Sequence, residues 1–301
     1  MPAPSGIAAG RRFLILTADD FGLHRRVNEA VERAASAGTL TAASLMVGAP
    51  AAADAIARAH DLPELRVGLH LVLADGRAVL PPRLIPSLVD SDGFFGNHLF
   101  RDAVRYFALP DVRRQVEAEI RAQFEAFAHS GLPLDHVNAH KHLHLHPTLL
   151  EIMLRVGAQF GLTAVRLPRE PPGFARRCAG LAGTASNLLL APWLAWMRTH
   201  LRGRGLIHND HVYGIACSGA WDESRLLRVL ADLPSGVSEI YLHPATAAPA
   251  ALSSSMQSYR HSEELDALLS LKVRRALAEA NFARGGYSDF LRLTALSAAQ
   301  S

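Results

Sequence analysis

Four histidines alternate with other residues in one short stretch, and histidine is the commonest metal ligand in proteins. The stretch reads Asn-Ala-His-Lys-His-Leu-His-Leu-His-Pro over residues 138–147 and follows an apolar run. Two other segments offer related chemistry, Thr-Ala-Asp-Asp-Phe-Gly at 17–22 and Gly-Leu-His-Leu at 68–71. Together they supply carboxylates and imidazoles, the ligand set of a hydrolytic metal centre.

We expect Asp20, His70 and His140 to bind a metal ion. Two imidazoles and one carboxylate leave coordination positions open for water and substrate, and this set suits Zn, Fe, Mn or, less naturally, Mg. The expected cofactor is therefore a divalent metal ion, with Mg and Zn as the candidates. His142 and His144 are expected to contact the substrate or to support the ligands.

The adjacent residues Asp19 and Asp20 would point to opposite faces of a straight strand, so the chain must turn there, and the following Phe-Gly permits it. Asp19 can then hold the attacking water as a general base, or else cap the next helix. His243 can protonate an amine leaving group, unless it is a packed structural histidine. Arg166 can bind substrate or pair with a carboxylate of the site, and a structural ion pair is equally compatible with its position.

Short apolar runs alternate with helical patterns along most of the chain, which indicates parallel strands joined by right-handed crossovers. Seven such units fit a single-domain α/β fold, a (β/α) barrel or a nearly closed variant. The aspartates and His70, His140 and His243 all fall at the carboxyl ends of predicted strands, the face where barrel active sites form. The predicted strands are Phe13–Leu16, Thr41–Val47, Val67–Leu71, His136–His140, Thr163–Leu167, His211–Ile215 and Glu239–His243.

The barrel is expected to span residues 11–290, between flexible ends at 1–10 and 291–301. Insertions at about 73–110 and 170–205 interrupt the alternation, and the first is rich in proline and glycine. The predicted helices are Arg26–Ala37, Ala51–Ala59, Val112–Ala128, Leu149–Phe160, Glu223–Leu230 and Glu263–Ala280.

The second insertion contains an apolar run, Leu-Leu-Leu-Ala-Pro-Trp-Leu-Ala-Trp-Met at 188–197, with arginines on both sides. Polar residues and a proline interrupt it too much for a comfortable bilayer span. Two interpretations stay open. The segment is a buried or lid helix, or it is an interfacial helix with Trp and Leu directed into the membrane and Arg toward anionic head groups.

The composition indicates a folded enzyme-sized protein without a nucleic-acid partner. The chain of 301 residues is 49% hydrophobic and 20% charged, and its net charge is only +3. Cys178 and Cys217 lie far apart with no CxxC motif, so a disulfide is not expected, which fits a reducing compartment. The first residues carry no secretory pattern. We therefore expect a cytoplasmic location, with association to the inner membrane surface as an option.

In this order, the motifs resemble those of the YdjC/ChbG family of carbohydrate deacetylases. Thr-Ala-Asp-Asp-Phe-Gly, Gly-Leu-His-Leu, His-x-His-x-His-x-x-Pro and a late Leu-His-Pro occur between residues 13 and about 275. The resemblance implies a polysaccharide-deacetylase-like (β/α) barrel that uses a divalent metal to remove acetate from N-acetylated sugars. It implies metal histidines at His70 and His140, the paired aspartates at Asp19 and Asp20, and the late histidine at His243.

One departure concerns the histidine segment, where the family often has Asp-Ser-His-His-His and this chain has Asn-Ala-His-Lys-His at 138–142. This version, together with the Trp/Leu/Arg segment, resembles the branch associated with hopanoid biosynthesis. That resemblance implies an N-acetylglucosaminyl lipid, rather than a chitobiose-type sugar, as the substrate. The expected partner is thus an N-acetylated sugar or glycolipid, with peripheral membrane contact as an option and the oligomeric state open. Two other classes remain as alternatives, a non-catalytic sugar or metal carrier and a non-haem iron oxygenase.

Overall fold

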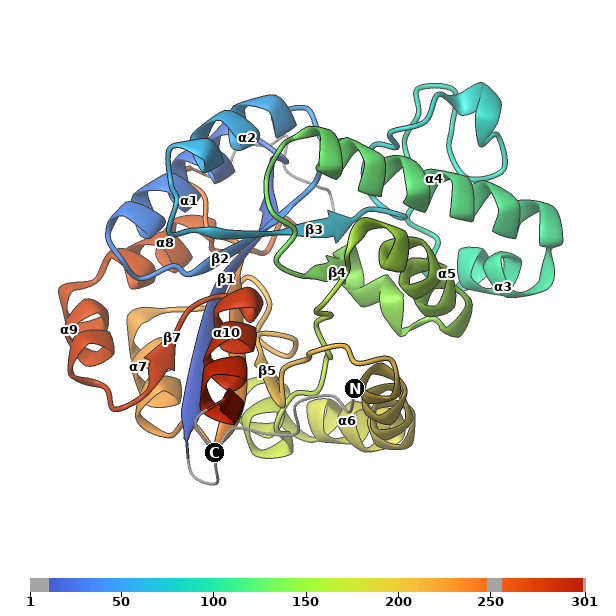
Figure 1. The fold of residues 1–301 in the computed structure, drawn as a ribbon. Coiled ribbons are helices and arrows are strands. Elements are labelled where there is room, and N and C mark those ends of the chain that lie inside the picture. The colour runs from blue at the N-terminus through green and yellow to red at the C-terminus, as the bar shows by residue number, and fades with distance from the viewer. Residues whose placement is uncertain (1–10, 248–255, 300–301) are drawn as a thin grey trace.

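A curled sheet of seven strands forms the centre of the molecule in the computed structural model, which describes residues 11–247 and 256–299 (Figure 1). The strand order is β4-β3-β2-β1-β6-β5, with β7 beside the start of β1, and every pairing is parallel. The α/β fold class predicted from the sequence is confirmed. The strands are β1 (Arg12–Phe21), β2 (Ala42–Leu45), β3 (Arg66–Leu71), β4 (Val137–Ala139), β5 (His211–Tyr213), β6 (Gly236–Leu242) and β7 (Ala283–Arg284).

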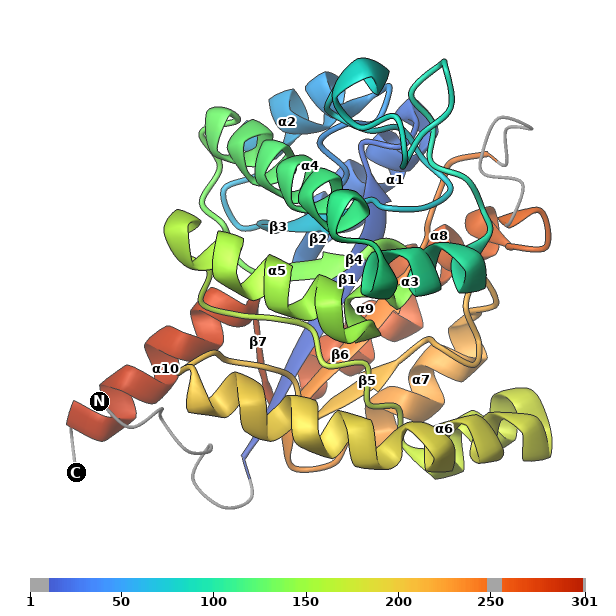
Figure 2. The same cartoon turned by 90° about the vertical axis from the view of Figure 1, so that its right-hand side faces the viewer.

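Helices surround the sheet because each has one apolar face to bury. In the first crossover helix the buried side chains recur at helical spacing, at Val27, Ala30, Val31 and Ala34. Figures 1 and 2 show the helices packed around the outside of the curled strands. They are α1 (Arg25–Ser36), α2 (Ala52–His60), α3 (Leu99–Ala108), α4 (Pro110–His129), α5 (Pro147–Gly157), α6 (Pro172–Gly203), α7 (Glu223–Ala231), α8 (His261–Leu269), α9 (Leu271–Glu279) and α10 (Tyr287–Ala299).

The segment predicted as a fifth strand, Thr163–Leu167, forms only isolated bridges, so this prediction is wrong as to secondary structure. The segment nevertheless lies where a strand of a barrel would lie, between the two edge strands of the sheet. The Arg166 N–H donates to the carbonyl of Val137 on the edge strand β4, and the Val165 N–H donates to the carbonyl of Ile207, which precedes β5. The segment thereby links the two edges of the sheet. The count of seven strands holds because of β7, which the sequence analysis did not predict.

The C-terminal region also differs from expectation. The single helix predicted over Glu263–Ala280 is two helices, α8 and α9, because Ser270 leaves the helical conformation and its Oγ accepts hydrogen bonds from the N–H groups of Lys272 and Val273. The expected domain boundary at 290 falls inside α10, which continues to Ala299. The segments 1–10 and 300–301, expected to be flexible, lie outside the described residues.

Both segments that were expected to be insertions contain helices. The first holds a short 3-10 turn, η1 (Pro82–Leu84), and α3, and it is fixed to the body of the protein where buried Glu119 on α4 accepts hydrogen bonds from the N–H groups of Val79 and Leu80. The second is α6, which lies along one end of the molecule (Figure 2). Among the described helices none is by itself long and apolar enough to cross a bilayer, whereas Pro172–Ala185 and Asn187–Gly203, bent by 88°, pass that test only as a pair.

A disulfide joins Cys178 on α6 to Cys217 in the loop between β5 and α7, with 5.6 Å between the Cα atoms. The expectation of unpaired cysteines is therefore wrong. The two residues are 39 positions apart in the sequence, and only the path of α6 back across the β5–α7 loop brings them together. The inference of a reducing compartment, so far as it relied on the cysteines, loses its basis.

Candidate active site

The two aspartates at the end of β1 face the same interior because the strand is irregular there. Asp20 has a left-handed backbone, with φ of 62°, and the pairing of β1 with β2 shifts register between Ala18 and Phe21. Gly22, with φ of 98°, then turns the chain, and a Cβ at this position would lie 3.1 Å from the carbonyl oxygen of Met46. The predicted turn is confirmed, and its centre is Asp20 itself. Such strain in a non-glycine residue is typical of functional sites.

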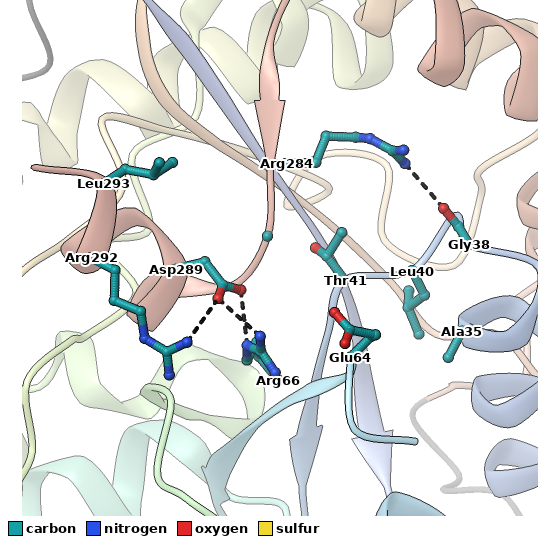
Figure 3. A pocket seen from close by; sticks show the side chains of 11 residues that line it. Ala35, Gly38, Leu40, Thr41, Glu64, Arg66, Arg284, Asp289, Arg292 and Leu293 are labelled. Carbon is teal, nitrogen blue, oxygen red and sulfur yellow. Dashed lines mark hydrogen bonds and ion pairs between the residues drawn. The ribbon is translucent and has the colours of Figure 1, made fainter. Parts of the chain in front are cut away.

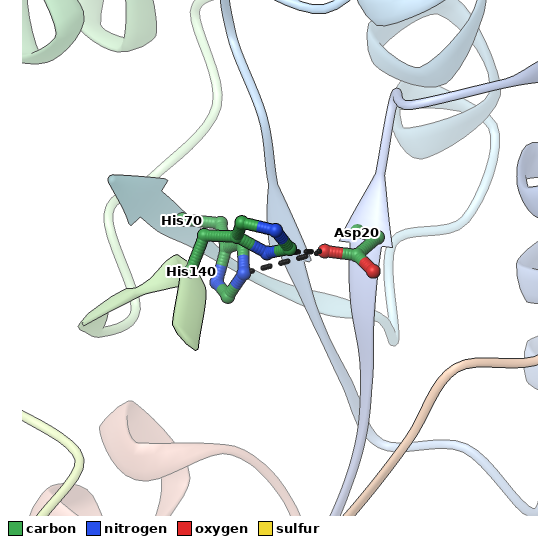
Figure 4. A group of neighbouring side chains, drawn as sticks. All are labelled: Asp20, His70 and His140. Atoms are coloured by element: carbon green, nitrogen blue, oxygen red, sulfur yellow. Dashed lines mark ion pairs between the residues drawn. The ribbon is translucent and has the colours of Figure 1, made fainter. Parts of the chain in front are cut away.

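Asp20, His70 and His140 form a compact buried group (Figure 4). Asp20 Oδ1 lies 3.4 Å from His70 Nε2 and 3.2 Å from His140 Nδ1, and one ligand atom from each residue lies within 4.8 Å of the others. Asp20 Oδ1 is buried and has no hydrogen-bond partner among the described residues. A buried carboxylate oxygen without a hydrogen-bond partner, facing two imidazoles, fits a divalent cation.

The expected strand His136–His140 is confirmed as the shorter β4, but the histidine-rich segment does not continue as a strand beyond it. Strand β4 ends at Ala139, and the next residues form 3-10 turns, η2 (His140–Leu145), in which Lys141 and His142 have φ of 54° and 53°. The alternating histidines therefore point to different places. His140 joins the metal group, the His142 Nε2 lies 3.0 Å from the Tyr241 hydroxyl, and the His144 Nε2–H donates to the carbonyl oxygen of Arg166 at 3.0 Å.

Arg166 is fully buried and pairs with two carboxylates at once. Its terminal nitrogens lie 2.5 and 2.9 Å from the oxygens of Asp19, and its Nε and Nη2 lie 2.9 and 2.8 Å from Glu239 on β6. Burial alone would raise the pKa of Asp19, but the Arg166 guanidinium outweighs that effect and holds the pKa well below its usual range. Asp19 is therefore ionised under all ordinary conditions, and Arg166 serves as its structural partner.

A cavity of about 180 Å³ opens beside the metal group. Of the predicted site residues, Asp19, His70, His140, His142 and His243 line it, whereas Asp20, His144 and Arg166 do not. The walls are completed by seven residues that the sequence analysis did not name as site residues, among them two tyrosines, a serine and a lysine. They are Ala139, Lys141, Ile215, Ser218, Tyr241, Met256 and Tyr259.

His243 enters this cavity as a neutral imidazole. Burial lowers its pKa to about 4, against the opposing effect of Asp20 and Asp19. Its Nδ1 is buried without a hydrogen-bond partner in the described part of the chain, and its backbone N–H donates to buried Glu264 at 2.5 Å. The backbone hydrogen bond fixes the position of His243, while its Nδ1 remains available to a ligand in the cavity.

Strand periodicity could have identified the two most important residues that were missed. Side chains at alternate positions of a strand face the same way, so the neighbours of His243 at positions 241 and 239 share its face. Tyr241 lines the cavity, with the Arg166 guanidinium 4.7 Å from its ring centre, and Glu239 binds Arg166. No local signal marks Ser218 or Tyr259, whose hydroxyls lie 2.7 Å apart although 41 residues separate them.

A larger cavity, of about 490 Å³, lies at the opposite ends of the strands, where β2 and β3 begin (Figure 3). Its arginines and Asp289 already have partners. Arg66 binds both oxygens of Asp289 at 2.9 and 3.0 Å, and Arg284 donates to the carbonyl of Gly38 at 3.0 Å. The contact between Arg66 and Asp289 ties α10 to the sheet, and none of the predicted site residues lines this cavity.

Comparisons with known proteins place the chain in a family. Residues 13–279 match the YdjC-like protein family, to which the chain belongs. It is 32% identical over 265 residues to a carbohydrate deacetylase of Brevibacillus brevis, covering 87% of this chain and 93% of that protein. A carbohydrate deacetylase of Mus musculus is 33% identical over 255 residues and 77% of each chain.

The fold has a counterpart among solved structures. A crystal structure of a proposed cellobiose-phosphate cleavage protein from Enterococcus faecalis superimposes with a TM-score of 0.70 at 23% identity, covering 93% of this chain and 99% of the other. At this identity the likeness supports the fold alone.

Proposed function

We propose that this protein is a metal-dependent hydrolase that removes the N-acetyl group from an amino sugar. The observation that carries the proposal is the buried Asp20, His70 and His140 group beside a cavity that Asp19 and His243 also line. The relatives named carbohydrate deacetylases support the same activity. A carrier would need the metal group but would have no use for an ionised carboxylate and a neutral imidazole in the same cavity.

Asp20, His70 and His140 would hold the metal ion. A divalent ion bound there would polarise the acetamide carbonyl and make a water molecule more acidic. The remaining steps belong to side chains of the cavity. Asp19 is ionised and fixed by Arg166, so it accepts a hydrogen bond from the attacking water and orients it. Its depressed pKa makes it a weak proton acceptor, which limits it to this orienting role.

The proton that leaves the water is assigned to His243. A neutral imidazole can accept that proton and then donate it to the amine nitrogen as the C–N bond breaks. The pKa of about 4 keeps this residue neutral before the reaction, as the first of these steps requires. His243 thereby acts first as base and then as acid.

The size of the cavity limits how much of the substrate is enclosed. At about 180 Å³ it is below the range of about 300–1,000 Å³ typical of pockets that bury a whole ligand. It can enclose the acetamide and part of one sugar ring, with the rest of the substrate outside. The Tyr241 ring and the polar groups of Ser218 and Lys141 would face that sugar.

We further propose that the substrate is a glycolipid, an N-acetylglucosaminyl hopanoid being the specific candidate, and that α6 rests on the cytoplasmic face of the inner membrane. The supporting observation is the exposed apolar surface of α6, where Leu181, Leu188, Leu189 and Trp196 are 77, 64, 83 and 44% exposed. The helix contains no acidic residue, and its arginines suit anionic head groups. Buried Leu194, Met197 and Leu201 anchor the opposite side of this helix.

The test is acetate release from an N-acetylglucosaminyl hopanoid and from N,N′-diacetylchitobiose, with and without a chelator. Chelator-sensitive release from either substrate supports the deacetylase, and release from the lipid alone supports the finer proposal. Metal binding without acetate release from either substrate would overturn the proposed activity and favour a carrier. Oxygen consumption by the Fe(II)-loaded protein would favour an oxygenase.

A further inference from the structure

One wall of the cavity is a loop, residues 214–220, that connects β5 to α7. Ile215 and Ser218 line the cavity from this loop. Neither residue belongs to a helix or a strand, so the loop needs other contacts to keep the two side chains in place. The residues that make these contacts lie just before α6 or in its first two turns, within the second of the segments expected to be insertions.

The first attachment is the carboxylate of Glu170, which is buried just before α6. Its Oε1 accepts hydrogen bonds from the N–H groups of Gly214 and Ile215 at 3.0 and 2.9 Å. Its Oε2 accepts from the N–H group of Ala216 at 3.1 Å. A carboxylate accepts through both oxygens and donates nothing, so it suits three converging donors. One side chain thus fixes three consecutive residues of the loop.

The second attachment is the disulfide from the next residue, Cys217, to Cys178 on α6. Between Glu170 and the disulfide, the buried ring of Phe174 packs against both ends of the loop. Its centre lies 5.1 Å from that of Tyr213 and 5.7 Å from that of Trp221. The start of α6 therefore holds the loop by hydrogen bonds, by aromatic packing and by a covalent bond.

The position of the loop decides which polar group Ser218 presents to the cavity. Its Oγ lies 2.7 Å from the hydroxyl oxygen of Tyr259, which lines the same cavity. One of the two hydroxyl groups donates to the other, so the second hydrogen can be donated to a ligand. A Cβ at Gly219 would lie 2.1 Å from the Tyr259 ring, so this ring packs directly on the backbone of the loop. A displaced loop would separate the two hydroxyl groups.

We propose that Glu170 and the disulfide position the loop so that Ser218 and Ile215 contact the sugar ring of the substrate. The inference rests on the proposed function and identifies what fixes the substrate-binding wall of its site. The groups assigned to metal binding and to proton transfer lie on other segments of the chain. Loss of an attachment should therefore weaken substrate binding and raise KM, while kcat changes little.

The first test measures amide hydrogen exchange by mass spectrometry and needs no substrate. In Glu170→Gln the side-chain NH₂ replaces one carboxylate oxygen, so it opposes a backbone N–H group instead of accepting from it. We expect amide exchange over residues 214–216 to become about tenfold faster or more, because the local opening of the loop is easier. Wild-type exchange in this variant would overturn the inference.

The matched control is Glu119→Gln. Glu119 is another buried glutamate, and it accepts from the N–H groups of Val79 and Leu80, neither of which is among the residues that line the cavity. Its replacement imposes the same mismatch in the first insertion, so exchange should rise there and stay unchanged over 214–216. A similar rise over 214–216 in this control would also contradict the inference.

The second test separates KM from kcat with N,N′-diacetylchitobiose or the N-acetylglucosaminyl hopanoid, whichever releases acetate. Glu170→Gln should raise KM about tenfold with kcat within about threefold of wild type, and Glu119→Gln should keep both within about twofold. Unchanged KM in Glu170→Gln would overturn the inference and leave deacetylation in place. No acetate release by the wild-type protein would instead overturn the proposed function, and with it the assignment of a sugar to this wall.

Reduction of the wild-type disulfide tests the second attachment without relying on the folding of a variant. Tris(2-carboxyethyl)phosphine breaks the S–S bond, both cysteines gain a hydrogen, and the phosphine is oxidised to its oxide with oxygen from water. We expect faster exchange over 217–220 and a KM raised about twofold or more, less than in Glu170→Gln because the carboxylate contacts remain. Cys217→Ser should show both changes and no response to the phosphine, which controls for effects of the reductant on bound metal. Complete reduction that changes neither measurement would overturn the role of the disulfide.

Discussion

Arg166 and Asp19 form a two-pronged ion pair in the interior, with nitrogen–oxygen distances of 2.5 and 2.9 Å. Asp19 lines the cavity, whereas Arg166 lies behind it and also holds Glu239. The sequence placed these residues at strand ends without deciding between a substrate-binding and a structural arginine. The geometry favours the structural role, so substitutions of the two partners should have different consequences.

Replacing Asp19 with asparagine should remove activity but not metal binding. Arg166 keeps Glu239 as its partner, and Asp20, His70 and His140 are unchanged. We expect a fall of about 10²-fold or more in kcat, because the attacking water loses the carboxylate that orients it. Activity is measured by acetate release, and bound metal by elemental analysis. Wild-type turnover in the variant would remove Asp19 from the mechanism.

Replacing Arg166 with methionine should destabilise the fold itself. Asp19 and Glu239 would remain buried without their cation, and such a loss lowers the free energy of unfolding by about 3–5 kcal/mol. Urea unfolding followed by circular dichroism measures it. The control is Arg198→Met, which breaks a half-exposed ion pair with Asp210 and should change stability by about 1 kcal/mol or less. Equal losses in the two variants would contradict the assignment.

Removal of His140 should abolish both metal binding and acetate release, because it supplies one of the three ligands. The matched control is His98→Ala, since that histidine is exposed and remote in sequence from the predicted ligands. Chelation of the wild-type protein should reproduce the loss, and re-addition of Zn²⁺ or Mg²⁺ should reverse it. Full activity of His140→Ala would show that the buried group serves another purpose.

The free energy of unfolding of the metal-free protein should depend on His144. Burial lowers the pKa of its imidazole to about 4, while an unfolded chain has the ordinary value near 6.5. Between these values the unfolded state binds a proton that the folded state does not, so stability falls as the pH falls. From pH 7 to 4.5 this amounts to about 2 kcal/mol.

Glu264 changes the free energy of unfolding with pH in the opposite direction. Burial raises its pKa to about 7, so the folded state binds a proton that the unfolded state does not. The measurement is therefore the difference between wild type and His144→Gln in urea unfolding at several pH values. That difference should change by the stated amount across the window, in the direction that favours the variant at low pH. Parallel pH profiles for the two proteins would contradict the prediction.

The exposed apolar side chains of α6 predict that a negative charge on this helix weakens membrane binding. Leu189→Glu should weaken sedimentation with vesicles that contain an anionic phospholipid, because it places a negative charge on the exposed apolar face. The matched control is Leu271→Glu on α9, a leucine that is 77% exposed on a different helix. Equal binding by both variants and wild type would exclude α6 as the membrane contact, without bearing on deacetylation.

The candidate metal group was predictable from the sequence because it depends on where parallel strands end. Asp20, His70 and His140 follow β1, β3 and β4 or lie at their ends, and such ends meet at one face of the sheet. Fine geometry was not predictable. A turn at the paired aspartates was predicted, but the left-handed backbone conformations of Asp20 and His142 were not, because no propensity fixes them.

Contacts between segments that are far apart in the sequence were not predictable either. The disulfide between Cys178 and Cys217 depends on the path of a long helix, and the approach of Arg166 to Asp19 and Glu239 depends on the curl of the sheet. The segment Thr163–Leu167 has the composition of a strand but makes only isolated bridges with its neighbours. Propensity alone could not distinguish it from a regular strand.

Fifty residues separate Asp20 from His70, and seventy more separate His70 from His140. These three side chains converge only after β1, β2, β3 and β4 have assembled into the sheet, so the unfolded chain cannot offer the same site. An ion that binds the folded state alone adds to its stability by mass action, by about 2.7 kcal/mol when the free ion exceeds its Kd a hundredfold. The concentration of the metal ion in the cell would then determine the stability of the folded protein as well as its activity.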